Sequence, residues 1–191
     1  MFYCDKVLSE GGCALDAVEA GCRKCEDLQC DGTVGWGGSP DEDGESTLDA
    51  MIMDGNTLNV GAVGCLRNIK PAVSVARAVL DHTRHSLLVG EKATQFAVKM
   101  GFTQENISSD DSLNMWRQWK DNNCQPNFWN NMTNSDSQCG PYSVPYQESE
   151  HDNSVQWGPG HHDTIGIIAM DAGGNIAAAT STNGARFKIP G

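Results

Sequence analysis

The stretch "DTIGIIAMDAGGNIAAATSTNG", residues 163–184, decides the class of fold. Two apolar runs of strand length, 164–170 and 174–182, lie on either side of a short segment rich in glycine. Such runs, separated by turn-forming residues, predict two neighbouring strands. The first run opens with Thr164, where a polar segment that contains histidines becomes apolar. Threonine is common in strands, but a hydroxyl at this junction is also a candidate nucleophile.

The sequence before this pair of strands predicts both helices and strands. Helical spacing of apolar residues predicts helices at 11–28, 70–83 and 91–100, and a capping serine or aspartate predicts another at 109–121. A central Asp-Gly pair predicts a hairpin within 46–66. The glycine-rich segment 31–45 is predicted to be a loop that brings its backbone close to another part of the chain. Together with the length of 191 residues, these elements predict one α+β domain.

A long polar stretch separates the last predicted helix from the two strands. Residues 122–161 contain prolines and asparagines, show no periodicity and exceed the usual length of a loop. We interpret them as a flexible connector. The connector divides the chain into a large portion, 1–163, and a short portion, 164–191.

Charge and composition argue against two classes of partner. The net charge is −12 and the isoelectric point is about 4.6, so the surface repels phosphate backbones and we expect no nucleic-acid partner. The apolar runs are far shorter than the ~20 residues of a membrane span, and residues 1–12 lack the pattern of a signal peptide. We therefore expect no membrane partner.

The cysteines allow two interpretations. Cys22, Cys25 and Cys30 have a spacing found in zinc and iron–sulfur sites, but a fourth ligand with matching spacing is missing. Eight cysteines together with two sequons, at Asn106 and Asn131, indicate the secretory pathway and N-linked glycans. In such a protein two disulfides, Cys25 with Cys30 and Cys124 with Cys139, are the favoured alternative to a metal.

The histidines before the candidate nucleophile also allow two interpretations. His151, His161 and His162 with Asp163 could suggest a metal, but the spacing of a metalloprotease motif is absent and we favour no metal here. Thr164 would instead be activated if its own α-amine were free, because that amine titrates near pH 8 and can take the hydroxyl proton. This activation requires a cut between Asp163 and Thr164.

Several segments, taken in order, resemble a known family. The segments "CDGTVGWGGSPDEDGESTLDAMIMDG", "NVGAVGCLRNIKPAVSVARAVLDHT", "NCQPNFW", "HDTIG" and "TSTNG" are similar to the glycosylasparaginase branch of the N-terminal nucleophile hydrolases. The resemblance implies a four-layer αββα sandwich and a lysosomal amidohydrolase without a cofactor. Such an enzyme cleaves the amide between N-acetylglucosamine and asparagine in glycoasparagines. It also implies an assembly of two αβ units.

The resemblance assigns roles to particular residues. The precursor would cut itself after Asp163, with His162 beside the cut, so that residues 1–163 belong to the α chain and 164–191 begin the β chain. Thr164 would be the nucleophile, and Thr182 would form a hydrogen bond with it. Thr33 occupies the position of a family serine near the new amine. The family's disulfides match the two pairs already favoured by the sequence.

The chain departs from the family pattern at both ends. A first strand with a tryptophan of the substrate pocket is not recognisable, and the sequence stops before the motif that grips the substrate's α-carboxyl and α-amino groups. We therefore expect an incomplete sandwich that is inactive alone. Two alternatives remain: an L-asparaginase or isoaspartyl peptidase with the same nucleophile, and a non-enzymatic paralogue.

Overall fold

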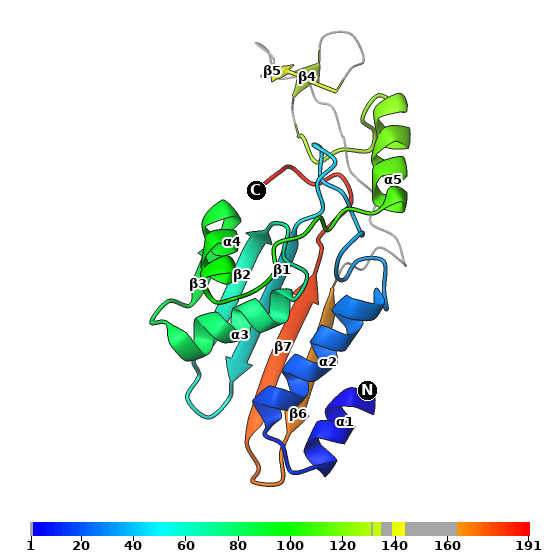
Figure 1. Cartoon of the computed structure of the whole chain (residues 1–191). Coiled ribbons are helices and arrows are strands. Elements are labelled where there is room, and N and C mark those ends of the chain that lie inside the picture. Colours follow the sequence, from blue (N-terminus) through cyan, green and yellow to red (C-terminus); the bar gives the residue numbers. More distant parts are fainter. Residues whose placement is uncertain (1, 131, 135–138, 144–163) are drawn as a thin grey trace.

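A five-stranded sheet forms the centre of the molecule (Figure 1). The computed structural model describes residues 2–130, 132–134, 139–143 and 164–191. The strand order is β3-β2-β1-β7-β6, and all neighbours are antiparallel except β2 and β3, which are parallel. The strands are β1 (Leu48–Asp54), β2 (Val60–Leu66), β3 (Leu87–Val89), β6 (Ile165–Met170) and β7 (Ile176–Thr182). Segments far apart in the sequence, β1 and β7, thus pair at the centre.

Both predicted hairpins are confirmed, and each turn is closed by an aspartate. Asp54 ends β1 and accepts hydrogen bonds from the backbone N–H of Asn56, at 2.9 Å, and the hydroxyl of Thr57, at 2.8 Å. Asp171 follows β6 and accepts from the backbone N–H of Gly173 at 2.9 Å. Short polar side chains commonly close turns in this way because they satisfy backbone donors that the strands leave unpaired.

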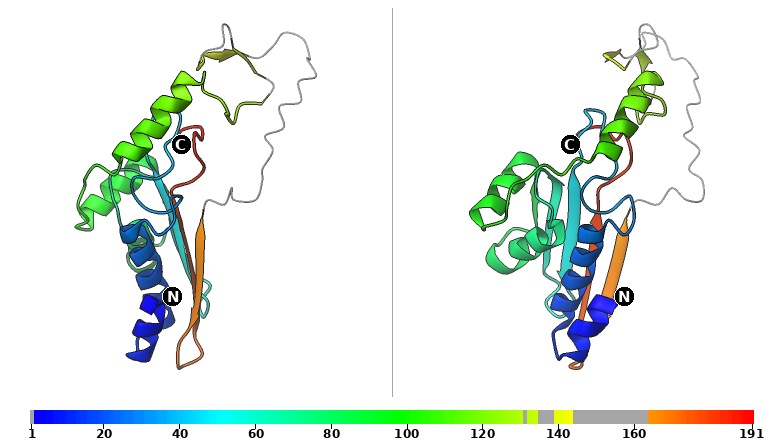
Figure 2. Two further views of the ribbon diagram at one scale, coloured as in Figure 1. Left: turned by 90° about the vertical axis from the view of Figure 1, so that its right-hand side faces the viewer. Right: turned by 45° about the vertical axis from the view of Figure 1, so that its right-hand side comes forward.

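The helices of the described ranges cover one face of this sheet, as the edge-on view in Figure 2 shows. The predicted helices are confirmed as α2 (Ala14–Leu28), α3 (Ala72–His82), α4 (Gly90–Lys99) and α5 (Asp110–Asp121). The helix α1 (Phe2–Ser9), which packs on α2, and the strand β3 were not predicted. Both are too short to show a clear period in the sequence.

The core lies between the helices and the sheet. Alternate residues of each strand point toward the helices, and the apolar faces of α2 and α3 pack against them. The residues buried in this layer include Val18, Val73, Val75, Val79, Leu48, Ile52, Ala177 and Ala179. Small side chains on β7 let α2 approach the sheet closely.

The opposite face of the sheet, here named the open face, carries exposed apolar side chains. Ile168 and Met170 of β6 are 77% and 63% exposed, and Ile176 of β7 is 48% exposed. The neighbouring residues along each strand point to the other face, and those such as Ala169 and Ala177 are buried against the helices. Contiguous exposed apolar side chains of this size mark a surface that another element usually covers.

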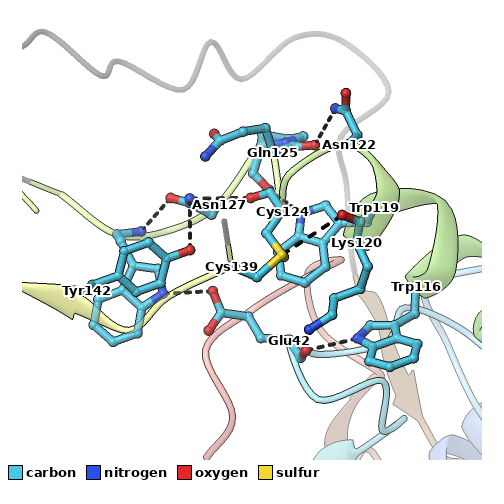
Figure 3. The surroundings of a disulfide bond; sticks show 12 residues. Glu42, Trp116, Trp119, Lys120, Asn122, Cys124, Gln125, Asn127, Cys139 and Tyr142 are labelled. Carbon is cyan, nitrogen blue, oxygen red and sulfur yellow. Dashed lines mark hydrogen bonds between the residues drawn. A yellow bond between two sulfur atoms is a disulfide. The ribbon is translucent and has the colours of Figure 1, made fainter. Parts of the chain in front are cut away.

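The segment beyond α5 has more structure than a polar connector suggests. The strands β4 (Thr133–Asn134) and β5 (Tyr142–Ser143) form a small antiparallel ribbon. A disulfide joins Cys124 to Cys139, and Figure 3 shows its surroundings. Nearby, the indole N–H of Trp116 donates to the backbone carbonyl of Glu42 at 2.9 Å, which ties α5 to the loop before β1. Within the predicted connector, the indole N–H of Trp129 donates to the carboxylate of Glu42 at 2.8 Å, so this described part is anchored to the rest of the chain.

The second predicted disulfide, Cys25 with Cys30, is also present and closes the end of α2. It contradicts the alternative of a metal held by Cys22, Cys25 and Cys30, because two of these sulfurs are bonded to each other. Burial raises the pKa of the Cys22 thiol to about 12, which disfavours the thiolate that a metal requires.

Among the described residues, no helix is both long and apolar enough to cross a bilayer.

Candidate active site

The register of β6 and β7 places the two main predicted hydroxyls together. Ile165 pairs with Ser181, so extending this antiparallel register by one residue puts Thr164 opposite Thr182. Ser181 is buried against the helices, whereas Thr164 is exposed and Thr182 is partly exposed. Alternation along the strands therefore directs both threonines to the open face. Directly opposite residues have Cβ atoms about 4.5–5.5 Å apart, within reach of a hydroxyl hydrogen bond.

The loop at 29–47 brings the third predicted residue, Thr33, to the same end of the sheet. Its backbone carbonyl accepts hydrogen bonds from the hydroxyl of Thr182, at 3.3 Å, and from the backbone N–H of Asn183, at 2.7 Å. The hydroxyl of Thr33 donates to the carboxylate of Asp31 at 2.6 Å. The three predicted residues thus meet at one site, and a carboxylate orients the hydroxyl of Thr33.

Asn183 holds this loop in place, a role that the sequence analysis did not assign. Its side chain is fully buried, and its amide nitrogen donates to the carbonyl of Gly35 at 2.9 Å. Its amide oxygen accepts from the backbone N–H of Ser39 at 3.2 Å. A Cβ at Gly38 would overlap the same amide. The prediction that the glycine-rich loop approaches another part of the chain is confirmed, and Asn183 is the residue it approaches.

The chain after β7 fastens the other side of this loop. The ammonium of Lys188 donates to the backbone carbonyl of Asn183 at 2.9 Å, and the backbone carbonyl of Lys188 accepts from Glu42 at 3.1 Å. Burial lowers the pKa of the Lys188 amine, and the nearby carboxylates of Asp41 and Asp49 partly oppose this effect. Lys188 therefore places a positive charge among acidic groups of the loop and of β1.

Comparison with known proteins identifies the family. A sequence model of the asparaginase family matches residues 3–191. The chain belongs to this family. It is 55% identical over 186 residues to the N(4)-(beta-N-acetylglucosaminyl)-L-asparaginase of Rattus norvegicus, a match that covers 96% of this chain and 54% of that protein. The mouse protein of the same name is 55% identical over 189 residues with the same coverage. The chain spans about half the length of these curated relatives.

Some residues proposed for this asparaginase-family chain lie outside the described residues. They are the two residues before the predicted cut, His162 and Asp163, together with His151, His161 and the sequon residue Asn131. The other sequon residue, Asn106, is described and is exposed. Within the described ranges, no group of three or more histidine, cysteine, aspartate or glutamate side chains is arranged to hold a metal ion.

In this member of the asparaginase family, hydroxyl and backbone groups lie together at one end of β6 and β7. Two threonine side chains share the open face, and a third threonine contributes a carbonyl and an oriented hydroxyl. Such a cluster suits nucleophilic attack by a hydroxyl, provided that a base accepts its proton.

Proposed function

We propose that this chain carries the nucleophile of an amidohydrolase that activates itself by cleavage between Asp163 and Thr164. The observation that supports this proposal best is the strand register, which puts Thr164 opposite Thr182 at the end of the sheet. Thr164 also lies immediately before β6, so a cut before it would leave the β6–β7 hairpin whole.

The cut would use the same hydroxyl as the later reaction. The Thr164 hydroxyl attacks the carbonyl carbon of Asp163, and the peptide C–N bond breaks as the ester C–O bond forms. Water then hydrolyses this ester, which leaves Asp163 as a new C-terminal carboxylate and Thr164 as a new N-terminus. We propose that His162 and Asp163 assist the proton transfers of this N-to-O shift.

The free α-amine then acts as the base in hydrolysis. It takes the proton of the Thr164 hydroxyl, whose oxygen attacks the side-chain amide carbon of the substrate. The resulting ammonium returns a proton to the leaving nitrogen as the C–N bond breaks, and water hydrolyses the acyl ester to release aspartate. Thr182 would hydrogen-bond the nucleophile. The Thr33 hydroxyl, oriented by Asp31, offers its oxygen as an acceptor for the new amine.

We propose a glycoasparagine as the substrate, cleaved between N-acetylglucosamine and asparagine. The names of the rat and mouse relatives at 55% identity support this choice. The description of the family as asparaginase supports a second candidate, hydrolysis of L-asparagine or of an isoaspartyl peptide by the same nucleophile. The two candidates differ in the leaving group and share the acyl-enzyme.

We also propose that the complete protein forms a four-layer αββα sandwich and assembles from two αβ units. The open face supports the sandwich, because Ile168, Met170 and Ile176 would be buried by a second sheet packed against it. The missing length, about half of each relative, is enough to supply that sheet and its helices. An uncovered face of this kind also supports the proposal that the chain alone is inactive.

We propose a lysosomal location and an N-linked glycan at Asn106. Asn106 is exposed, its side-chain oxygen accepts from the backbone N–H of Ser108 at 2.9 Å, and Ile107 between them is buried. A glycan on this outward side chain would leave the core undisturbed, and the two disulfides suit an oxidising secretory compartment.

Expression in a secretory host tests the glycan. The tryptic peptide that contains Asn106 should carry a glycan, and enzymatic deglycosylation should convert this asparagine to aspartate. Ser108→Ala should abolish the modification, because the sequon needs a hydroxyl residue at this position. An unmodified Asn106 peptide from a correctly secreted protein would contradict the proposal.

The hydrolase proposal is tested with a chimera in which this chain replaces the matching segment of the rat relative. After expression, mass spectrometry should find two chains, the second beginning Thr-Ile-Gly-Ile. The purified chimera should release N-acetylglucosamine-derived amino sugar and aspartate from the glycoasparagine faster than it releases aspartate from asparagine. Faster hydrolysis of asparagine would favour the second candidate. An uncut, inactive chimera would indicate a non-enzymatic paralogue, and an uncut but active one would exclude the α-amine mechanism.

A further inference from the structure

A buried carboxyl group lies directly behind the threonine site and has no role in the proposed reaction. Glu26 belongs to α2, and its side chain is only 1% exposed. One of its oxygens, Oε1, accepts a hydrogen bond from the hydroxyl of Ser181 at 2.6 Å and another from the backbone N–H of Val73 at 3.0 Å. A single oxygen therefore connects α2 with the first turn of α3 and with the end of β7.

This connection meets β7 next to the candidate site. Ser181 directs its side chain to the helices, whereas the following residue, Thr182, directs its side chain to the open face. Because consecutive residues share one rigid peptide unit, the position of Ser181 determines where Thr182 lies. The register extended by one residue beyond the pair Ile165–Ser181 puts Thr182 opposite Thr164.

The loop of the site is fastened to the same glutamate residue. Gly35 has a φ angle of +80°, and a Cβ there would overlap the backbone carbonyl of Glu26. The carbonyl of Gly35 accepts the side-chain amide of Asn183. The backbone of Glu26 thus lies close against the loop that holds Thr33, while its side chain bonds to β7.

We propose that Glu26 is a positioning residue that holds Thr182, through Ser181, in register with the nucleophile Thr164. This inference depends on the proposed function. Misplacement of a reacting group by about 1 Å can reduce a rate roughly 100-fold, so a hydrogen bond behind the strand can control turnover without contact with the substrate.

The protonation state of Glu26 makes this role dependent on pH. Burial raises the pKa of its carboxyl to about 7, although the hydrogen bonds from Ser181 and Val73 lower it. The charged groups around it are Arg23, which lowers the pKa, and Asp27, which raises it. The second oxygen, Oε2, is buried and has no hydrogen-bond partner among the described residues. Ionisation would therefore leave a buried charge with only one of its oxygens bonded.

The direction of the pH effect follows from this raised pKa. The neutral carboxyl is favoured in the folded state, so its stabilising contribution is complete below the ordinary value of 4.5. The contribution is lost as the pH rises through about 7. The thiol of Cys22, which also interacts with Glu26, stays protonated throughout this range because burial raises its pKa to about 12. The packing of α2 against β7 around this buried carboxyl should therefore be most stable in acid, where the group carries no charge.

Three variants of the chimera test this role: Glu26→Gln, Glu26→Ala and, as a matched control on the surface, Glu10→Gln. Glutamine keeps an acceptor for Ser181 and Val73 but cannot ionise. Its kcat relative to the parent should be near unity at about pH 5 and should rise severalfold by about pH 8. Alanine removes the acceptor, and kcat should fall at least tenfold, with KM changed by less than about twofold. The control should match the parent at every pH.

The outcomes separate this inference from the proposed function. Suppose that the parent is active. If the ratio of the Glu26→Gln kcat to the parent kcat does not change with pH, or if Glu26→Ala keeps the parent kcat, only the role of Glu26 is contradicted. If the alanine variant does not fold, the pH dependence of the kcat ratio for Glu26→Gln alone tests the role of Glu26. A parent that neither cuts itself nor hydrolyses substrate contradicts the proposed function. In that event thermal unfolding provides the test. The unfolding temperature of the parent, relative to that of Glu26→Gln, should decrease as the pH is raised from about 5 to about 8. If this difference does not change with pH, the role of Glu26 is contradicted as well.

Discussion

Thr164→Ala in the chimera should give a single uncut chain without measurable hydrolysis. The substitution removes the oxygen that attacks in both proposed reactions, and no second hydroxyl can replace it at the start of β6. Loss of a covalent nucleophile typically reduces turnover by about 10⁴-fold or more, so only a trace of activity should remain. The strand itself should persist, because Ile165 to Met170 pair with β7 independently of this side chain.

Two controls define the result. Thr164→Ser keeps a hydroxyl and should still produce a cut chain, although more slowly, because serine adopts more rotamers than threonine. Thr103→Ala changes an exposed threonine in the loop after α4 and should behave as the parent. Denaturing electrophoresis measures the cut, and release of aspartate measures turnover. Cleavage or full activity in Thr164→Ala would contradict the assignment of the nucleophile.

Asn183→Ala should have the second-largest effect, because it damages the site and the fold together. The substitution leaves the buried backbone N–H of Ser39 and the carbonyl of Gly35 without their partner. Each unsatisfied buried group costs about 1–3 kcal/mol, so we expect a loss of roughly 2–6 kcal/mol in the free energy of unfolding. The loop would also lose its position, and with it the carbonyl of Thr33 that contacts Thr182. Self-cleavage should slow at least tenfold.

Thermal unfolding and the time course of cleavage measure these two effects. Asn114→Ala is a matched control, because this asparagine lies on the exposed side of α5 and bonds only to Arg117 among the contacts of the described residues. It should lower the unfolding midpoint by no more than about 1–2 °C. If Asn183→Ala matched that control in both measurements, the loop would not depend on the amide.

The main elements could be predicted because each has a strong local signal. α2 and α3 show the helical spacing of apolar residues, and the two hairpins contain aspartate and glycine at their turns. α1 and β3 escaped prediction because eight and three residues give too few repeats of a period. The ribbon of β4 and β5 escaped because two-residue strands are stabilised by a disulfide and by long-range contacts.

The candidate site was predicted only in part. Thr33, Thr164 and Thr182 are candidates on sequence grounds, and they lie at one end of the sheet; their catalytic roles stay predictions. Asn183 and Glu26 are not predicted, although both lie within predicted elements or motifs. Their roles arise from contacts across 148 and 155 residues of sequence, respectively, which no local pattern records.

The mixed α and β class of fold, the two disulfide pairs and the choice of three threonines as candidate site residues could all be predicted from the amino-acid sequence. These properties follow from hydrophobic periodicity, turn chemistry and short motifs, which neighbouring residues define. Three further features became visible in the folded molecule: Asn183 fills the glycine-rich loop, one oxygen of Glu26 joins two helices to β7, and no described helix covers the open face. Burial and hydrogen bonding at these places depend on segments that meet after the chain has folded, so their energies belong to the packed molecule.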